Sequence, residues 1–99
     1  MVREGKRIRT EHLEFRAAVS PLAHPRIGFI VPKHKQTGVA RNRLKRWLRE
    51  ITRLRILRAL PAVDLVVRAR PEAYAASMGA LSSDMCRAVD RIGALFQRP

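Results

Sequence analysis

Residues 41–58, RNRLKRWLREITRLRILR, contain eight of the chain's 21 Lys and Arg residues around a single acid, Glu50. The apolar residues recur at the i, i+3, i+4, i+7 spacing of one helix face; they are Leu44, Trp47, Leu48, Ile51 and Leu54. The opposite side is polar and basic, with Asn42, Lys45, Arg46, Arg49 and Arg53. Lys and Arg are almost never buried without a partner, so the pattern predicts an amphipathic helix whose basic face meets solvent or a polyanion.

The same periodicity predicts where the regular winding of this helix ends. Beyond Arg55 the register fails, because Ile56 and Leu57 would point toward the basic side. We therefore expect the helix to fray or bend before Pro61. Trp47 lies on the apolar face, so we expect it to pack in the core rather than stack on a base.

Length and charge restrict the class of protein. A chain of 99 residues predicts one domain over residues 1–99. The formal net charge of +13 favours a nucleic acid or an anionic membrane surface as partner. Cys86 is the only cysteine, so no internal disulfide can form, and a reducing cytoplasm fits. Without a signal-peptide pattern or a long apolar run, we expect a soluble cytoplasmic protein.

Three segments have the composition of strands: residues 13–19 (LEFRAAV), 26–31 (RIGFIV) and 63–70 (VDLVVRAR). The first two are joined by a short connection, which predicts an antiparallel pair. A second helix is expected from Pro71 onward, with a break near Gly79 or the Ser82 and Ser83 pair. The order strand, strand, helix, strand, helix predicts an α+β fold, a small two-layer sandwich with both helices on one side of the sheet.

The loop before the first helix, KHKQTG, carries Lys33, His34 and Lys35, and Thr37 is the candidate cap of that helix. His12, His24 and His34 are scattered, without metal-ligand spacing to Cys86 or to an acid. The eight acids form no paired-carboxylate motif, so we expect no catalytic side chain and no cofactor held by the protein alone. We expect Cys86 to be a buried, inert thiol, and Tyr74, Met78 and Met85 to be core residues.

The stretch RIGFIVPKHKQTGVARNRLKRWLREITR, residues 26–53, resembles the core of the bacterial ribonuclease P protein subunit. The signature of that family is a strand, a lysine-rich turn, and a helix that opens with R-N-R and continues to R-E. Arg41, Asn42 and Arg43 match the triplet, and Arg49 and Glu50 match its end. The trailing VDLVVRARPEAYAAS, residues 63–77, strengthens the resemblance.

The resemblance implies a subunit that binds a large catalytic RNA and assists RNA-catalysed endonucleolytic removal of the 5′ leader from precursor tRNA. The RNA would supply the chemistry, with Mg²⁺ around its phosphates, and neither a membrane nor DNA is expected as a partner. The residues implied to contact the catalytic RNA are Arg41, Asn42, Arg43, Lys45, Arg46, Arg49 and Arg53, together with the turn residues Lys33, His34 and Lys35. A cleft between the sheet and the R-N-R helix would take the leader, with Arg16 and Arg68 as candidates.

The family also usually begins with a short helix and a further strand. This chain starts around where that strand would end, so we expect both to be shortened or missing. Arg16 falls where an aromatic residue is frequent in the family, which exchanges stacking on a ring for stacking on a guanidinium plane.

Two other functions fit part of the pattern. A structural protein of the ribosomal type could bind folded RNA through the same basic helix without any role in cleavage. An amphipathic helix with Trp47 and a basic face could also lie at a membrane surface, although the predicted strands offer its apolar stripe a core.

Overall fold

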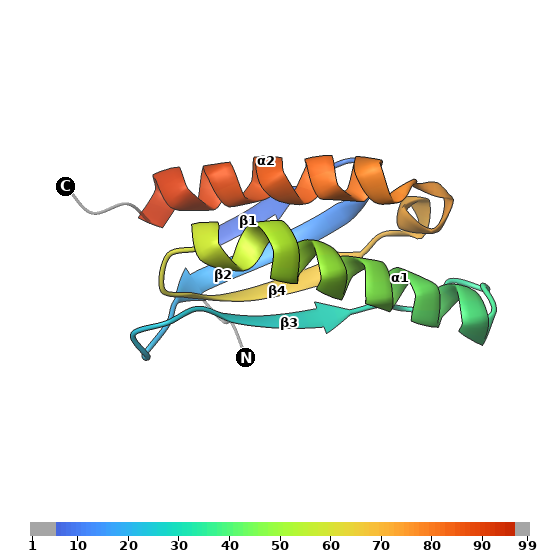
Figure 1. Cartoon of the computed structure of the whole chain (residues 1–99), viewed down its shortest axis with the longest axis horizontal. Coiled ribbons are helices and arrows are strands. Elements are labelled where there is room, and N and C mark those ends of the chain that lie inside the picture. The colour runs from blue at the N-terminus through green and yellow to red at the C-terminus, as the bar shows by residue number, and fades with distance from the viewer. Residues whose placement is uncertain (1–5, 97–99) are drawn as a thin grey trace.

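The sheet has four strands, one more than the sequence patterns predict. The computed structural model describes residues 6–96, with strands β1 (Lys6–Arg9), β2 (Leu13–Val19), β3 (Arg26–Ile30) and β4 (Val63–Ala69) (Figure 1). Helix α1 (Gly38–Ile51) lies between β3 and β4, and helix α2 (Met78–Phe96) follows β4. Short helical segments connect these elements: η1 (Thr52–Ile56), η2 (Leu57–Ala59) and η3 (Pro71–Ala75). The expected α+β fold is confirmed.

The strand order is β1-β2-β4-β3, with β4 antiparallel to β2 and parallel to β3. The expected pairing of residues 13–19 with residues 26–31 is therefore wrong, because β4 lies between them. The register of β2 on β4 runs from Leu13 opposite Ala69 to Val19 opposite Val63. Two parallel neighbours such as β3 and β4 need a crossover connection, and α1 provides it.

The additional strand, β1, pairs with β2 in antiparallel fashion and places Ile8 opposite Phe15. Its sequence, KRIR, contains one apolar residue, which is too few to show an alternation. The strand expected to be shortened or missing is thus present with four residues. The expectation about a preceding helix concerns residues 1–5, which lie outside the described residues.

Both helices cover the same face of the sheet (Figure 1). Helix α1 contributes three buried residues, Leu44, Leu48 and Ile51, and α2 contributes a longer row that includes Leu81 and Met85. The strands meet them with every second residue, among them Leu13, Phe15, Ala17, Leu65 and Val67. The other face of the sheet carries no helix from residues 6–96 and is left open.

Helix α1 begins as expected, and its C-terminal continuation changes winding. The Thr37 hydroxyl accepts a hydrogen bond from the amide of Ala40 at 3.1 Å, which confirms the cap. After Ile51 the chain winds as the π-helix η1, whose i to i+5 bonding places Ile56 on the same side as Ile51. Ile56 is therefore buried, at 1% exposure, and Leu54 is 60% exposed, the reverse of the expectation from a regular helix.

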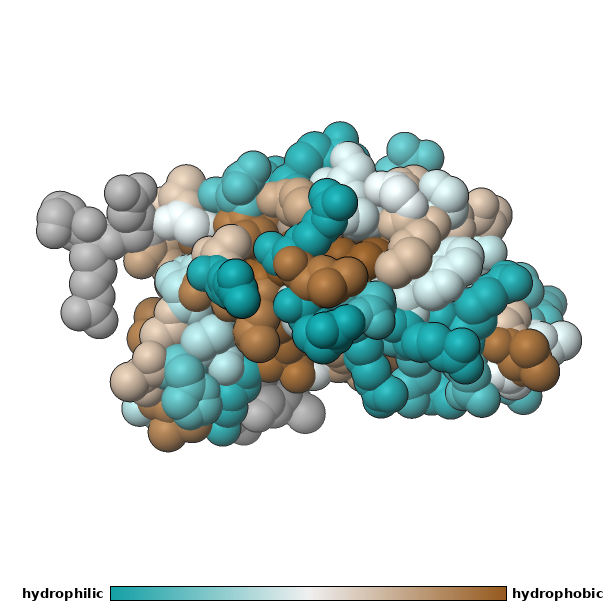
Figure 2. Space-filling view, viewed as in Figure 1, coloured by the Kyte–Doolittle hydropathy of each residue, from teal (hydrophilic) through white to brown (hydrophobic). Residues whose placement is uncertain are grey.

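The surface over α1 follows from this arrangement. Figure 2 shows a hydrophilic band over the helix, with apolar surface beside it toward the η1 end. Leu54 and Leu57 are exposed in that region. The change predicted before Pro61 is thus a change of winding: the helical turns first widen to a π-helix in η1 and then tighten to a 3-10 helix in η2.

Helix α2 begins later than the sequence suggests. Residues Pro71–Ala75 form the separate turn η3, and Ala76 is extended with ψ of 149°. The helix predicted from Pro71 is thus interrupted at Ala76, before the region of Gly79 and Ser82 where the sequence allowed a break, and α2 is continuous from Met78. Of the residues expected in the core, Met85 is buried, whereas Tyr74, Met78 and Cys86 are half-buried against it.

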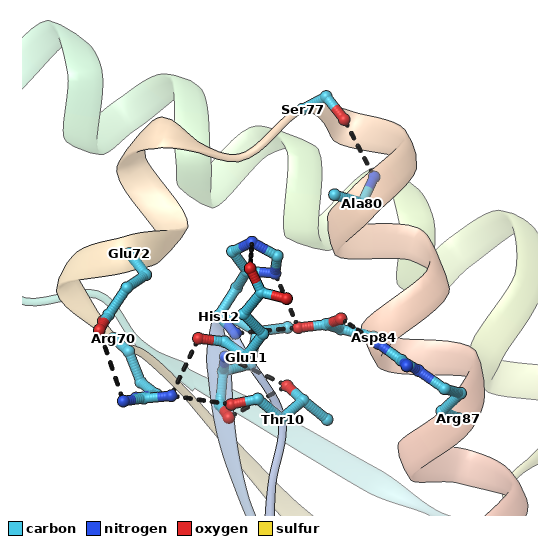
Figure 3. A network of polar contacts seen from close by, with 10 residues as sticks. Thr10, Glu11, His12, Arg70, Glu72, Ser77, Ala80, Asp84 and Arg87 are labelled. Atoms are coloured by element: carbon cyan, nitrogen blue, oxygen red, sulfur yellow. Dashed lines mark hydrogen bonds and ion pairs between the residues drawn. The ribbon is translucent and has the colours of Figure 1, made fainter.

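One buried carboxylate links α2 to the turn between β1 and β2 (Figure 3). Asp84 is 1% exposed and accepts hydrogen bonds from the backbone amide of His12 at 3.0 Å and from Arg87 at 2.7 Å. The His12 ring Nδ1 lies 2.9 Å from the same carboxylate. Burial acts to raise the pKa of Asp84, but hydrogen bonds from Thr10, His12 and Arg87 outweigh it, so the pKa is lowered.

We predict that Asp84→Asn lowers the free energy of unfolding by about 1–3 kcal/mol at neutral pH, the usual cost of disrupting a buried charged hydrogen-bond acceptor. A lowered pKa means that the Asp84 contribution is present above the unfolded carboxyl pKa of about 3.9 and is lost below it. Urea denaturation at several pH values measures this difference. It should shrink as the pH falls from about 5 to 2, whereas Asp90→Asn, an exposed change on the same helix, should have little effect at any pH. An equal loss for both variants would contradict the linking role of Asp84.

Candidate nucleic-acid interface

The outward face of α1 and the start of η1 form a shallow basic groove. It has a volume of about 380 Å³ and is lined by Asn42, Lys45, Arg46, Arg49, Glu50 and Arg53. These are five of the seven helix residues predicted to contact RNA, together with the one acid of the segment. Among residues 6–96, the ion pair between Arg53 and Glu50 is the only one on this face. Most of its positive charge is therefore available to an external anion.

The start of α1 concentrates positive potential further. The first turn contains no acid, and Arg41 and Arg43 lie close behind it. The amino end of a helix carries a partial positive charge, so cations there are unfavourable unless an anion binds. Exposed amides and arginines at one helix end are suited to phosphate groups.

Two arginines of the R-N-R triplet are held in place by the protein itself. The Arg41 Nε donates to the carbonyl of Val31 at 2.7 Å, which ties the start of α1 to the end of β3. The Arg43 guanidinium lies over the Trp47 ring, 5.4 Å from its centroid. Trp47 is half-buried against the core, which confirms that it packs rather than projects outward. Arg43 is consequently a supported, exposed cation.

The lysine-rich turn before α1 has a specific shape. His34 and Lys35 have positive φ angles of 48° and 66°, and the amide of Gln36 donates to the carbonyl of Lys33 at 2.8 Å. His34 turns inward, with Nε2 3.3 Å from the carbonyl of Ala69 and its ring edge-on to Tyr74. Lys33 and Lys35 remain exposed. The turn therefore presents its two lysines, whereas His34 supports it.

A second groove lies on the open face of the sheet. Arg16 and Arg68 both line it, within a volume of about 300 Å³. The other lining residues are Arg7, Glu14, Phe15, Ile30 and Val66. The sequence did not determine which face of the sheet these arginines occupy, and the structure places both on the face away from the R-N-R helix. Register pairs Arg7 with Arg16 and Arg16 with Val66, on the face opposite to the buried residues.

Sequence reasoning missed several residues of this open groove. Arg7 belongs to the strand that was not predicted, because KRIR contains only one apolar residue. Ile30, which is 46% exposed, and Val66 give the groove an apolar floor. Toward the other end of the same face, Arg26 forms two hydrogen bonds with Asp64, at 2.7 and 2.6 Å. The hydrogen bonds from Arg26 lower the pKa of Asp64, and the carboxylate of Asp64 neutralises the charge of Arg26.

Within residues 6–96, neither helix has the length and apolar character that a membrane span requires. In the same range, no three His, Cys, Asp or Glu side chains gather closely enough to hold a metal ion.

A small, strongly basic α+β domain with two cationic surfaces is typical of nucleic-acid-binding proteins. Comparison with known proteins is more specific. Residues 1–93 match the family model described as Ribonuclease P. The chain belongs to the ribonuclease P protein family.

Individual relatives agree with the family model. The ribonuclease P protein component of Syntrophobacter fumaroxidans is 44% identical over 72 residues, which are 72% of this chain and 60% of that protein. The corresponding protein of Aliivibrio fischeri is 34% identical over 98% of this chain and 80% of its own length. The RNase P protein from Thermotoga maritima, solved in complex with 1-(4-fluorophenyl)-2-thiourea, has a TM-score of 0.80 at 28% identity. That alignment covers 90% of this chain and 87% of the other.

Proposed function

We propose that this chain is the protein subunit that binds the catalytic RNA of ribonuclease P and the 5′ leader of precursor tRNA. The RNA would cut the leader to give the mature tRNA 5′ end, with Mg²⁺ bound among its phosphates, in the cytoplasm. The protein would contribute binding and orientation rather than catalytic side chains. The observation that carries the proposal is the pair of separate cationic grooves, one on α1 and one on the open sheet face.

The α1 groove is suited to the backbone of a folded RNA. Guanidinium groups form bidentate contacts with phosphates, and several arginines on one helix face can follow a helical phosphate row. Arg41, Arg43 and the exposed lysines of the turn extend this surface beyond the start of α1. Glu50 is the only acid lining the groove, so a polyanion would meet little repulsion.

The open sheet groove is suited to an extended single strand. Single-stranded RNA binds where cations follow the backbone and side-chain planes or apolar surfaces meet the bases. Arg16 and Arg68 provide cations, and Ile30 and Val66 provide an apolar floor. The groove therefore fits a leader that is bound without strict sequence readout.

Cleavage of precursor tRNA by a bacterial ribonuclease P RNA at low Mg²⁺, with and without this protein, tests the proposal. We expect the protein to accelerate cleavage at Mg²⁺ concentrations where the RNA alone is slow. Tight RNA binding without acceleration would favour the ribosomal-type alternative. The membrane-surface alternative has little support, because Leu44, Leu48 and Ile51 bury the apolar stripe of α1 in the protein core.

For the α1 groove, we predict that Arg46→Ala or Arg49→Ala weakens binding of the catalytic RNA and leaves folding intact. Each lost phosphate contact should reduce the slope of log K against log salt by about 0.7–0.9. Binding titrations at several salt concentrations measure the slope. Arg58→Ala, an exposed change on η2 outside the groove, is the matched control. An unchanged slope for both groove variants would remove them from the interface.

For the open groove, we predict that Arg16→Gln or Arg68→Gln weakens binding of precursor tRNA by the holoenzyme several-fold. Affinity for mature tRNA should stay the same, because it has no leader. Arg26→Gln is the control, since it removes one charge from the same face at a side chain already paired with Asp64. Equal losses for precursor and mature tRNA would contradict a leader site on this face.

A further inference from the structure

The open sheet groove continues around the edge of the sheet. A third groove, of about 330 Å³, shares Glu14 and Arg68 with the open groove and adds Arg9 and Arg70. A fourth, of about 260 Å³, shares Arg9 with the third and reaches Arg87 and Arg91 on α2. Neighbouring grooves thus share lining residues, and they follow one another along the surface from the open face, past the end of β1, to α2.

The residues at the far end of this path form a separate cationic cluster. Arg87 and Arg91 are one helical turn apart on the exposed side of α2, where like charges repel. Arg87 donates to the buried Asp84 at 2.7 Å, and its side chain remains 66% exposed (Figure 3). Arg9 is 67% exposed and lies 3.9 Å from Glu14. We name Arg9, Arg87 and Arg91 the edge cluster.

The edge cluster is anchored rather than merely solvated. Asp84 holds Arg87 through a carboxylate that is itself buried, and the same carboxylate binds the His12 amide in the turn after β1. This arrangement sets the position of Arg87 relative to Arg9 across two elements. Glu11 is the one acid lining the same groove, and it lies 3.5 Å from the His12 ring. Arg9 and Arg87 each lie near a further acid, Glu14 and Asp84, whereas Arg91 forms no ion pair within residues 6–96. Arg91 is therefore the cation of the cluster that is most available to an anion.

We propose that the edge cluster binds the sugar-phosphate backbone of the distal part of the 5′ leader, after the leader has crossed the open sheet face. The proposal rests on the proposed leader site and extends it to a further contact on α2. The shared arginines, Arg68 and then Arg9, favour one continuous strand over a separate RNA segment. The contact would be insensitive to base sequence, because the cluster offers charge without an aromatic stacking platform.

The test uses the reconstituted holoenzyme and precursor tRNAs that differ only in leader length, about 4 against about 16 nucleotides, the range of single-strand site sizes. We expect Arg91→Gln to weaken binding of the long-leader substrate about threefold or more and to leave the short-leader substrate unchanged. Arg9→Gln should behave in the same way. The salt slope for the long leader should fall by about 0.7, the value for one phosphate of a single strand.

Arg58→Gln is again the control, and Arg91→Lys, which keeps the charge, should restore most of the affinity. Arg91 is chosen over Arg87 because Arg87 also contacts Asp84, so its loss could disturb folding. Equal losses for short and long leaders, or no loss for either, would overturn the proposal. Weaker assembly with the catalytic RNA in the absence of substrate would overturn it in favour of a second RNA-subunit contact. If wild-type protein fails to stimulate cleavage, the proposed function itself fails, which is a different outcome.

Discussion

The burial of one stripe of α1 against the sheet is the constraint on which the other surfaces depend. Leu44, Leu48 and Ile51 enter the common core, and this orientation of the helix exposes its basic side to solvent. Burying three large aliphatic side chains is worth several kcal/mol, which exceeds the few tenths that each repulsive arginine pair costs. The protein can therefore hold a concentrated positive charge on a folded helix before any RNA is present.

The parallel pairing of β3 with β4 determines where the two cationic surfaces lie. Helix α1 crosses over one face to join these strands, and α2 returns over the same face, so the opposite face stays open. Residues of even number on β2 and β4, such as Arg16 and Arg68, then point away from the helices. The chain thus separates a helix surface suited to folded RNA from a sheet surface suited to a single strand.

Sequence periodicity predicted the parts of the fold that follow from local pattern. The limits of β2, the Thr37 cap and the buried stripe of α1 agree with the structure, because each depends on side chains close in the chain. The β2 to β3 pairing was wrong, since pairing depends on which strand fills the centre of the sheet. Ile56 is buried and Leu54 is exposed, the reverse of the prediction, because a π-helix changes the angle per residue and a fixed periodicity of about 100° cannot show this.

The candidate sites divide in the same way. The residues of the α1 groove could be predicted from the sequence, because helical spacing alone places them on one face. The open groove could not, since Arg7, Arg16 and Arg68 come from three strands and meet only through the register. The orientation of His34 could not be predicted either, because its contacts with Ala69 and Tyr74 join residues far apart in the chain. Asp84, one of eight scattered acids by sequence, acquires its role from burial, and through Arg87 it connects the protein core to the edge of the proposed RNA path.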